Sequence, residues 1–401
     1  MKISKPVLLF AVLCLLLPTA AAADDDPPNK RHPAYSLTGR DAPSATSPLN
    51  PNFVVTEEAR LSESGFWSSP WIPETLVGLS VADLDQDGRN EVIYASSRNV
   101  YVAQVNGQRL DQLARYSLPP TETIISLDTF DLAGDGRPLI ICSSQNDKKF
   151  PAAFILRYGG GELTPVSSNI PWFLRVVGAP GGRFLAGQKG GSTRTDFYSG
   201  SVMRMNFDGS GVKSAGQVGL PPFVNLFNFT LGRLGSGGAQ VVAAIKFPSE
   251  HIFLFDGQTR ETETREEYAG TMNYIVAPGA GDNERREYLP ARILIADIDG
   301  DGQNELIVAK NDRGGVPFMG NQRGFSSGAM QAFKYVNLSL SPFFRSRALP
   351  GPGVDYALAD FNNDGTPDLV VAVVTEHKSG LLKDGRSRIV AYEIGRPAGD
   401  Q

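Results

Sequence analysis

Two patterns of hydrophobic and polar positions alternate along the chain from about residue 75 to residue 395. In the first, an acidic or glycine-rich turn leads into an apolar, often β-branched run, as residues 83–91 lead into residues 92–95. In the second, apolar and polar residues alternate and usually end at a glycine turn, as residues 100–105 end at Asn106-Gly107. Asn-Gly and Asp-Gly turns favour tight hairpins, because both residues tolerate a positive φ. The two patterns therefore predict short antiparallel strands.

Each pattern occurs six times. The first covers residues 83–95, 131–141, 178–186, 232–244, 297–309 and 360–372, and the second covers residues 100–105, 154–158, 202–207, 252–255, 330–335 and 389–394. A repeat of about 45 to 65 residues reads strand, acidic turn, strand, variable loop, strand, turn, strand. No such unit buries both of its faces alone, so the units must pack around an axis. The sequence predicts an all-β fold, a six-bladed β-propeller of four-stranded antiparallel blades.

The ends of the repeat region bear on how the ring closes. The last repeat ends after its third strand, near Ile394, while an apolar segment at residues 53–56 precedes the first repeat. We therefore expect the N-terminal segment to supply the outer strand of the last blade, within a propeller domain at residues 53–397. A seventh, degenerate blade from residues 33 to 75 is the alternative.

Three of the acidic turns share one spacing, with oxygen-bearing side chains at positions one, three, five and nine and glycine at position six. Several carboxylates in one tight turn are the hard oxygen ligands that Ca²⁺ prefers, and the residue at position seven can add its backbone carbonyl. The predicted ligands are Asp83, Asp85, Asp87, Arg89 and Glu91; Asp297, Asp299, Asp301, Gln303 and Glu305; and Asp360, Asn362, Asp364, Thr366 and Asp368. We expect two to three calcium ions, with a fourth conceivable at the degenerate loop that begins at Asp131. Asp-rich turns held by their own hydrogen bonds, without metal, are the alternative.

The loops are not EF-hands, because position twelve holds Tyr94, Val308 and Val371 where an EF-hand has a glutamate. The form Asp-x-Asp-x-Asp-Gly-x-x-Glu/Asp, followed by an apolar strand, resembles the FG-GAP/VCBS repeat that is shared with the head of integrin α chains. The resemblance covers about residues 75–395. It implies a propeller with Ca²⁺ at Asp83, Asp85, Asp87, Glu91 and their counterparts, although the second, third and fourth repeats have lost some or all of these acids. A family resemblance of this kind does not identify a ligand.

The N-terminal residues predict export. A short basic segment, an apolar run at residues 7–17 and small residues up to Ala23 form a signal peptide at residues 1–23, followed by a flexible leader at residues 24–52. The apolar run is too short to span a bilayer, so we expect no membrane insertion after cleavage and a periplasmic or extracellular protein. The formal net charge of −5 argues against nucleic acid as a partner. Cleavage leaves only Cys142, which we expect in the core.

The variable loops between the second and third strands are the predicted binding surface, because long loops on a rigid scaffold commonly carry recognition. The candidate residues are Lys189, Tyr198, Phe318, Arg323 and Phe325. The sequence favours a recognition or scaffolding module for an extracellular protein or glycan. A polysaccharide lyase or hydrolase is the alternative, but no spacing assigns Lys189, Tyr198, Glu376 or His377 a catalytic role.

Overall fold

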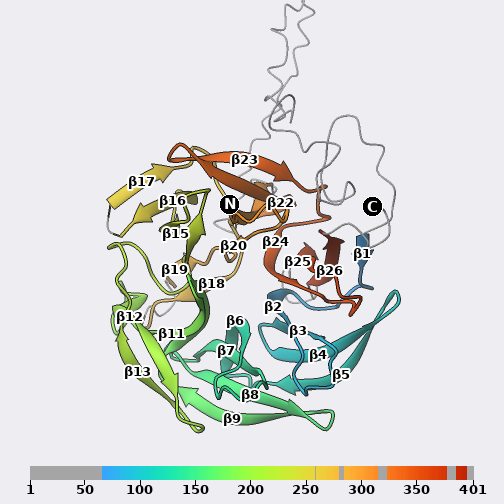
Figure 1. Ribbon diagram of the computed structural model, residues 1–401. Coiled ribbons are helices and arrows are strands. Elements are labelled where there is room, and N and C mark those ends of the chain that lie inside the picture. Colours follow the sequence, from blue (N-terminus) through green and yellow to red (C-terminus); the bar gives the residue numbers. More distant parts are fainter. Residues whose placement is uncertain (1–65, 258, 280–283, 315–322, 377–384, 395–401) are drawn as a thin grey trace, which may run out of the picture. The chain divides into compact units, whose positions relative to one another are not determined.

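The computed structural model describes residues 66–257, 259–279, 284–314, 323–376 and 385–394. Within these ranges the chain forms strands and turns, and no helix. Six four-stranded antiparallel sheets follow one another along the chain and surround a common axis (Figure 1). The chain is therefore an all-β, six-bladed propeller, and the six-blade prediction is confirmed.

The first three blades each use four consecutive strands, which are named below in order from the axis outward. Blade one contains β2 (Leu76–Ala82), β3 (Glu91–Ser96), β4 (Asn99–Asn106) and β5 (Arg109–Ser117). Blade two contains β6 (Glu122–Phe130), β7 (Leu139–Asn146), β8 (Ala153–Gly159) and β9 (Glu162–Ile170). Blade three contains β10 (Phe173–Ala179), β11 (Gly182–Gly190), β12 (Tyr198–Phe207) and β13 (Val212–Gln217).

Blades four and five are built in the same way. Blade four contains β14 (Phe229–Leu234), β15 (Ala239–Lys246), β16 (His251–Asp256) and β17 (Thr259–Glu263). Blade five contains β20 (Leu294–Ala296), β21 (Glu305–Arg313), β22 (Phe325–Val336) and β23 (Ser339–Arg345). Between them lies an additional hairpin, β18 (Tyr274–Val276) and β19 (Arg286–Tyr288), which the repeat pattern does not predict.

Blade six combines the two ends of the described chain. Its inner strands are β24 (Gly353–Ala359), β25 (Asp368–Glu376) and β26 (Arg386–Glu393), and its outer strand is β1 (Phe66–Ser68). β1 pairs antiparallel with β26, so that Trp67 lies opposite Ala391. The prediction that an N-terminal segment closes the last blade is confirmed. Residues 53–56 lie outside the described residues, and the domain limits at 53 and 397 stay predictions.

The hydrophobic runs that follow the acidic turns become the second strands of the blades. β3 is buried along its whole length, because one of its faces packs on blade six and the other on blade two. Strands that are buried on both faces read as continuous apolar runs. Cys142, on β7, is fully buried, as predicted. The inner strands line the axis in chain order, with β2 lying against both β6 and β24.

Candidate functional site

The acidic loop of blade one, residues 83–91, joins β2 to β3 and is folded around its own carboxylates. Asp83 accepts hydrogen bonds from the backbone amides of Gln86, at 2.7 Å, and Gly88, at 3.0 Å. Glu91 accepts a hydrogen bond from the Leu84 amide at 2.9 Å. Both oxygens of Asp83 and one oxygen of Glu91 are thus used to shape the turn.

The loops of blades five and six repeat this arrangement. Asp297 and Asp360, at position one, accept backbone amides of the turn at 2.8 to 3.0 Å. Glu305 and Asp368, at position nine, accept the amide of position two at 3.2 Å. At position seven, the amides of Arg89, Gln303 and Thr366 each donate to the position-five carboxylate at 2.8 Å. The shared spacing in the sequence therefore corresponds to one shared loop geometry.

Two positions of each loop have a positive φ. Position six is the glycine that the sequence pattern contains, with φ of 83° at Gly88. Position four is also left-handed, although it is occupied by Gln86 (65°) in blade one and Asn363 (63°) in blade six. Only glycine, and to a lesser degree asparagine, adopts this region at little cost. Gly300 at position four of blade five was the signal for this second turn position, and sequence reasoning missed it.

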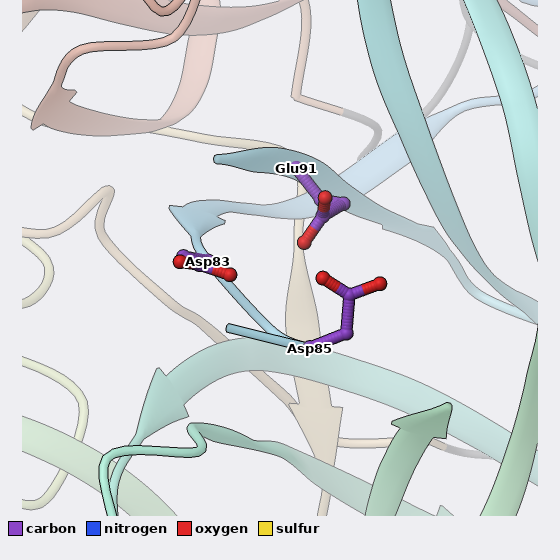
Figure 2. Close-up of side chains that lie close together, drawn as sticks. All are labelled: Asp83, Asp85 and Glu91. Atoms are coloured by element: carbon purple, nitrogen blue, oxygen red, sulfur yellow. The ribbon is translucent and has the colours of Figure 1, made fainter. Parts of the chain in front are cut away.

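In blades one and five the carboxylates of positions one, three and nine converge. One oxygen each from Asp83, Asp85 and Glu91 lies within 4.8 Å of the others, and Figure 2 shows the three side chains around a common space. Asp297, Asp299 and Glu305 form the same triad in blade five. These are the two such groups within the described residues. Position five, Asp87 or Asp301, lies outside both triads, and blade six forms none.

The position-nine carboxylates are costly to ionise. Burial raises the pKa of Glu91 to about 7, and the neighbouring charges of Asp85, Asp87 and Asp83 add to the effect. Burial likewise raises the pKa of Glu305 and of Asp368 to about 7. A buried carboxylate among other carboxylates is stabilised in its charged form by a nearby cation. The donor set of blade one, oxygen atoms from several acids, fits a hard divalent cation such as Ca²⁺.

The loop of blade five already contacts a cationic side chain of the protein. The Lys334 ammonium, on β22, lies 2.8 Å from Asp299, 2.6 Å from Asp301 and 3.8 Å from Glu305. Burial disfavours the charged ammonium, but its bonds to Asp299 and Asp301 hold the pKa of Lys334 above its ordinary value. Among the described residues, no basic group lies within 4.0 Å of a carboxylate in the blade-one loop. The two triads therefore have the same arrangement of carboxylates, but only the blade-five triad has a cationic side chain beside it.

The loops of blades two and six have weaker donor sets. In blade six the Asn362 amide group donates to Asp364 at 2.8 Å, so that this side chain serves as a donor inside the loop. In blade two, Asp131 keeps its bonds to the turn at 2.7 and 2.8 Å, but position nine is Leu139. The proposed fourth calcium ion would lack a ligand there.

Neighbouring loops on this face are bonded to one another. Asn90, at position eight of blade one, donates to the Asp360 carbonyl of blade six at 2.7 Å. On the other side, Gln86 donates to the Asp135 carbonyl of blade two at 3.1 Å. Because of these bonds, an interaction that stabilises the blade-one loop also restrains the loops of blades six and two.

An ion-pair network crosses the axis of the ring. Arg292, just before β20, contacts Asp128 on β6 at 3.0 Å and Asp355 on β24 at 2.8 Å. Arg175 on β10 contacts the second oxygen of Asp128 at 2.9 Å. The two aspartate side chains are only 3% and 7% exposed. Sequence reasoning missed this network, although a single aspartate within an apolar strand, as in residues 122–130, was a visible signal.

Each end of the axis opens into a cavity. The cavity on the side of the acidic loops has a volume of about 610 Å³, and its basic lining residues are Arg175, Arg183, Arg233 and Arg292. The cavity at the other end, which we call the cleft, has a volume of about 740 Å³. The cleft is lined by the starts of β2 and β6, by loops between second and third strands, and by the hairpin β18–β19. Its charged lining residues have both signs, and they are Glu74, Arg98, Lys149, Glu284, Arg286 and Arg323.

The hairpin β18–β19, which lines the cleft, is attached to blade two. Gln145, at the end of β7, exchanges two hydrogen bonds with the backbone of Val276, at 2.9 and 3.0 Å. The Asn273 side chain donates to the Ile125 carbonyl at 2.5 Å. Residues that are about 130 positions apart in the chain are thus joined on this face.

The residues predicted to bind a partner occupy different surroundings. Arg323 lines the cleft, but its side chain is only 13% exposed and is paired with Glu250. Lys189 lies over the ring of Trp172 at 4.2 Å, and Tyr198 packs against Phe173.

Phe325, at the start of β22, is partly buried. Phe318 lies outside the described residues. Of the four described residues of this set, the structure places only Arg323 in the cleft, and partner binding stays a prediction for all five.

Comparison with known proteins supports the repeat. Residues 83–142 match the model of the FG-GAP-like repeat. The solved structures that are similar to the chain include two that are described as BBS1N in complex with ARL6DN. One was soaked with lead (14% identity, TM-score 0.43) and the other with mercury (12%, 0.45), and each match covers 84% of this chain and 99% of that chain.

No curated protein matches the sequence. Among the residues that the structure describes, no helix has the length and apolar character needed to cross a bilayer.

Proposed function

We propose that this chain, an FG-GAP-repeat β-propeller, is an exported recognition module. In this proposal it binds a partner protein in the cleft. The observation that carries the proposal is the cleft itself, a cavity of about 740 Å³ built from four blades and the inserted hairpin. It lies on the face with the variable loops, where binding residues commonly gather. The acidic-loop face then serves as a calcium-braced support.

The lining of the cleft suits a protein better than a glycan. Sugars commonly stack on open aromatic faces, but the Tyr274 ring is covered by Arg286 at 4.4 Å and the Tyr288 ring by Arg323 at 4.5 Å. Lys149 and Glu284 present opposite charges at the rim and are each about one-third exposed. Charges of both signs favour a partner surface that is itself mixed in charge.

An enzyme is not favoured by these contacts. Of the groups considered from the sequence, Lys189 stacks on Trp172 in blade three, whereas Glu376 pairs with Arg386 in blade six at 3.6 Å. General acid–base chemistry needs both groups within reach of one substrate. His377 lies outside the described residues.

Calcium binding belongs to the proposal at the blade-one loop. Asp83, Asp85 and Glu91 supply three converging oxygens, and the loop is bonded to its neighbours in blades six and two. Bound calcium would lower the charge repulsion within the loop and stiffen this face. An exported protein would meet the calcium concentrations at which extracellular modules bind, about 10⁻⁴ to 10⁻³ M. N-terminal sequencing of the exported chain tests the export step, and we expect it to begin at Asp24.

The cleft is tested with a photo-crosslinking amino acid at position 149, and with the same group at position 213 on the outer strand β13 as a control. We expect adducts with a partner protein from position 149 only. For the partner so identified, Lys149→Glu should weaken binding at least about tenfold, because it places a like charge beside Glu284. Lys213→Glu, at a side chain that is 79% exposed, should leave the affinity unchanged.

Equal labelling from both positions, or an unchanged affinity of Lys149→Glu, would contradict the proposal. Binding to an array of polysaccharides that Lys149→Glu abolishes would identify a glycan ligand instead.

A further inference from the structure

The blade-five carboxylate triad contacts a cationic side chain, and within the described residues the blade-one triad does not. This difference indicates that only the blade-one triad is a metal site. We propose that the Lys334 ammonium is the resident cation of the blade-five loop, so that this loop does not take Ca²⁺ although its acids match the family pattern. The inference refines the calcium part of the proposed function, because it separates the blade-one loop from its counterpart.

The ammonium contacts two carboxylates of the blade-five triad, those of Asp299 and Glu305, and also the position-five carboxylate of Asp301. Lys334 lies within 2.8 Å of Asp299 and Asp301 and 3.8 Å from Glu305, which are positions three, five and nine of the loop. A divalent ion bound to the same oxygens would be a like charge at close range. It would have to displace the lysine, and the cost of moving that charge opposes binding.

The lysine is held by more than its charge. Its ammonium also lies over the ring of Phe343, on β23, at 4.5 Å from the ring centre. Its side chain is 28% exposed, so solvent screens these contacts less than those of a surface lysine. One Glu305 oxygen is buried and accepts no hydrogen bond, and Lys334 is the one basic group within 4.0 Å of it among the described residues. Removing the ammonium would leave that oxygen without a cation.

The same structural position differs in charge between blades. The first residue after each acidic loop pairs with a residue of the third strand: Val92 with Ala103, Leu306 with Phe333 and Leu369 with Tyr392. The position compared between blades is the next residue along that third strand. The position holds Gln104 in blade one, Lys334 in blade five and Glu393 in blade six. All three side chains are partly buried. The third strand therefore decides whether an acidic loop has its own counter-ion.

The test exchanges the two positions in the full-length mature protein and counts Ca²⁺ by isothermal titration calorimetry. We expect Lys334→Gln, which copies blade one, to bind one more equivalent than the wild type. We expect Gln104→Lys, which copies blade five, to bind one fewer. Asp299→Asn alone should leave the wild-type stoichiometry unchanged. Circular dichroism and thermal unfolding verify that each variant is folded.

Two results would overturn the inference: a loss of one equivalent in Asp299→Asn, or no gain in a folded Lys334→Gln variant. Failure of the blade-one proposal is a different result. If the wild type binds no calcium but Lys334→Gln binds one equivalent, the role of Lys334 stands and the blade-one site is wrong.

Discussion

The two faces of the ring are built by opposite means. On the acidic-loop face, the same nine-residue loop geometry recurs in blades one, five and six, and each loop is shaped mainly by hydrogen bonds between residues at most seven positions apart. On the cleft face, the described lining residues include a hairpin outside the repeat pattern and loops that differ in sequence from blade to blade. There, the inserted hairpin β18–β19 is bonded to blade two, and Arg323 from blade five is paired with Glu250 from blade four.

The difference separates support from recognition. A repeated local loop can carry the same ring-stabilising role in several blades, although only one copy is the proposed metal site. A surface assembled from unlike segments presents one arrangement of charges, which suits a single partner. The buried Arg292 network lies between the two faces and joins inner strands from several blades.

Removing Arg292 should have the largest effect, because both faces depend on the closed ring. Arg292→Leu would leave Asp355 buried without its arginine and Asp128 with only Arg175, and breaking a buried pair commonly costs about 3–5 kcal/mol. Urea unfolding should show this loss in the free energy of unfolding. Arg109→Ala, at a side chain that is 70% exposed, is the control and should change it by less than about 0.5 kcal/mol. A loss below about 1 kcal/mol for Arg292→Leu would show that the network is dispensable.

Cutting the hairpin from blade two should affect the cleft face alone. Gln145→Ala removes two bonds to Val276 and one to the Lys149 carbonyl, and leaves a buried amide and carbonyl of Val276 without these partners. We expect a loss of about 1–3 kcal/mol. Hydrogen exchange should become faster in β18 and β19 while the loop at residues 83–91 keeps its protection. Equal acceleration on both faces would mean that they are coupled through this contact.

Removing the blade-one carboxylates should affect the acidic-loop face alone and have the smallest effect. If calcium binds there, a concentration ten times the dissociation constant stabilises the wild type by about 1.4 kcal/mol. In Asp83→Asn/Asp85→Asn this calcium-dependent gain should be lost, as measured by thermal unfolding with chelator and with added calcium. The matched Asp297→Asn/Asp299→Asn variant should keep the gain. Affinity for the cleft partner is expected to change little in either variant.

Much of the architecture could be predicted from the sequence because its signals are local. The acidic turns, the apolar runs after them and the alternating segments that usually end at a glycine turn are all short in the sequence, and their sixfold recurrence indicated the number of blades. Of the five blade-one ligands predicted from the spacing, Asp83, Asp85 and Glu91 bring their oxygens together, whereas Asp87 lies outside this group. The hairpin β18–β19 could not be predicted in this way, because a single insertion breaks the repeat and its partners are remote.

The sequence alone therefore determined the propeller, the position of its acidic loops and the order of the blades, since short-range turn chemistry and strand periodicity suffice for these. Only the tertiary structure decided which charges meet. Lys334 lies 29 residues beyond Glu305 in the chain, and Arg292 is 164 residues from Asp128, yet both pairs are in contact. Electrostatic energy depends on distance in space rather than on separation in sequence, so strand pairing and ring closure had to be known before those contacts could be assigned.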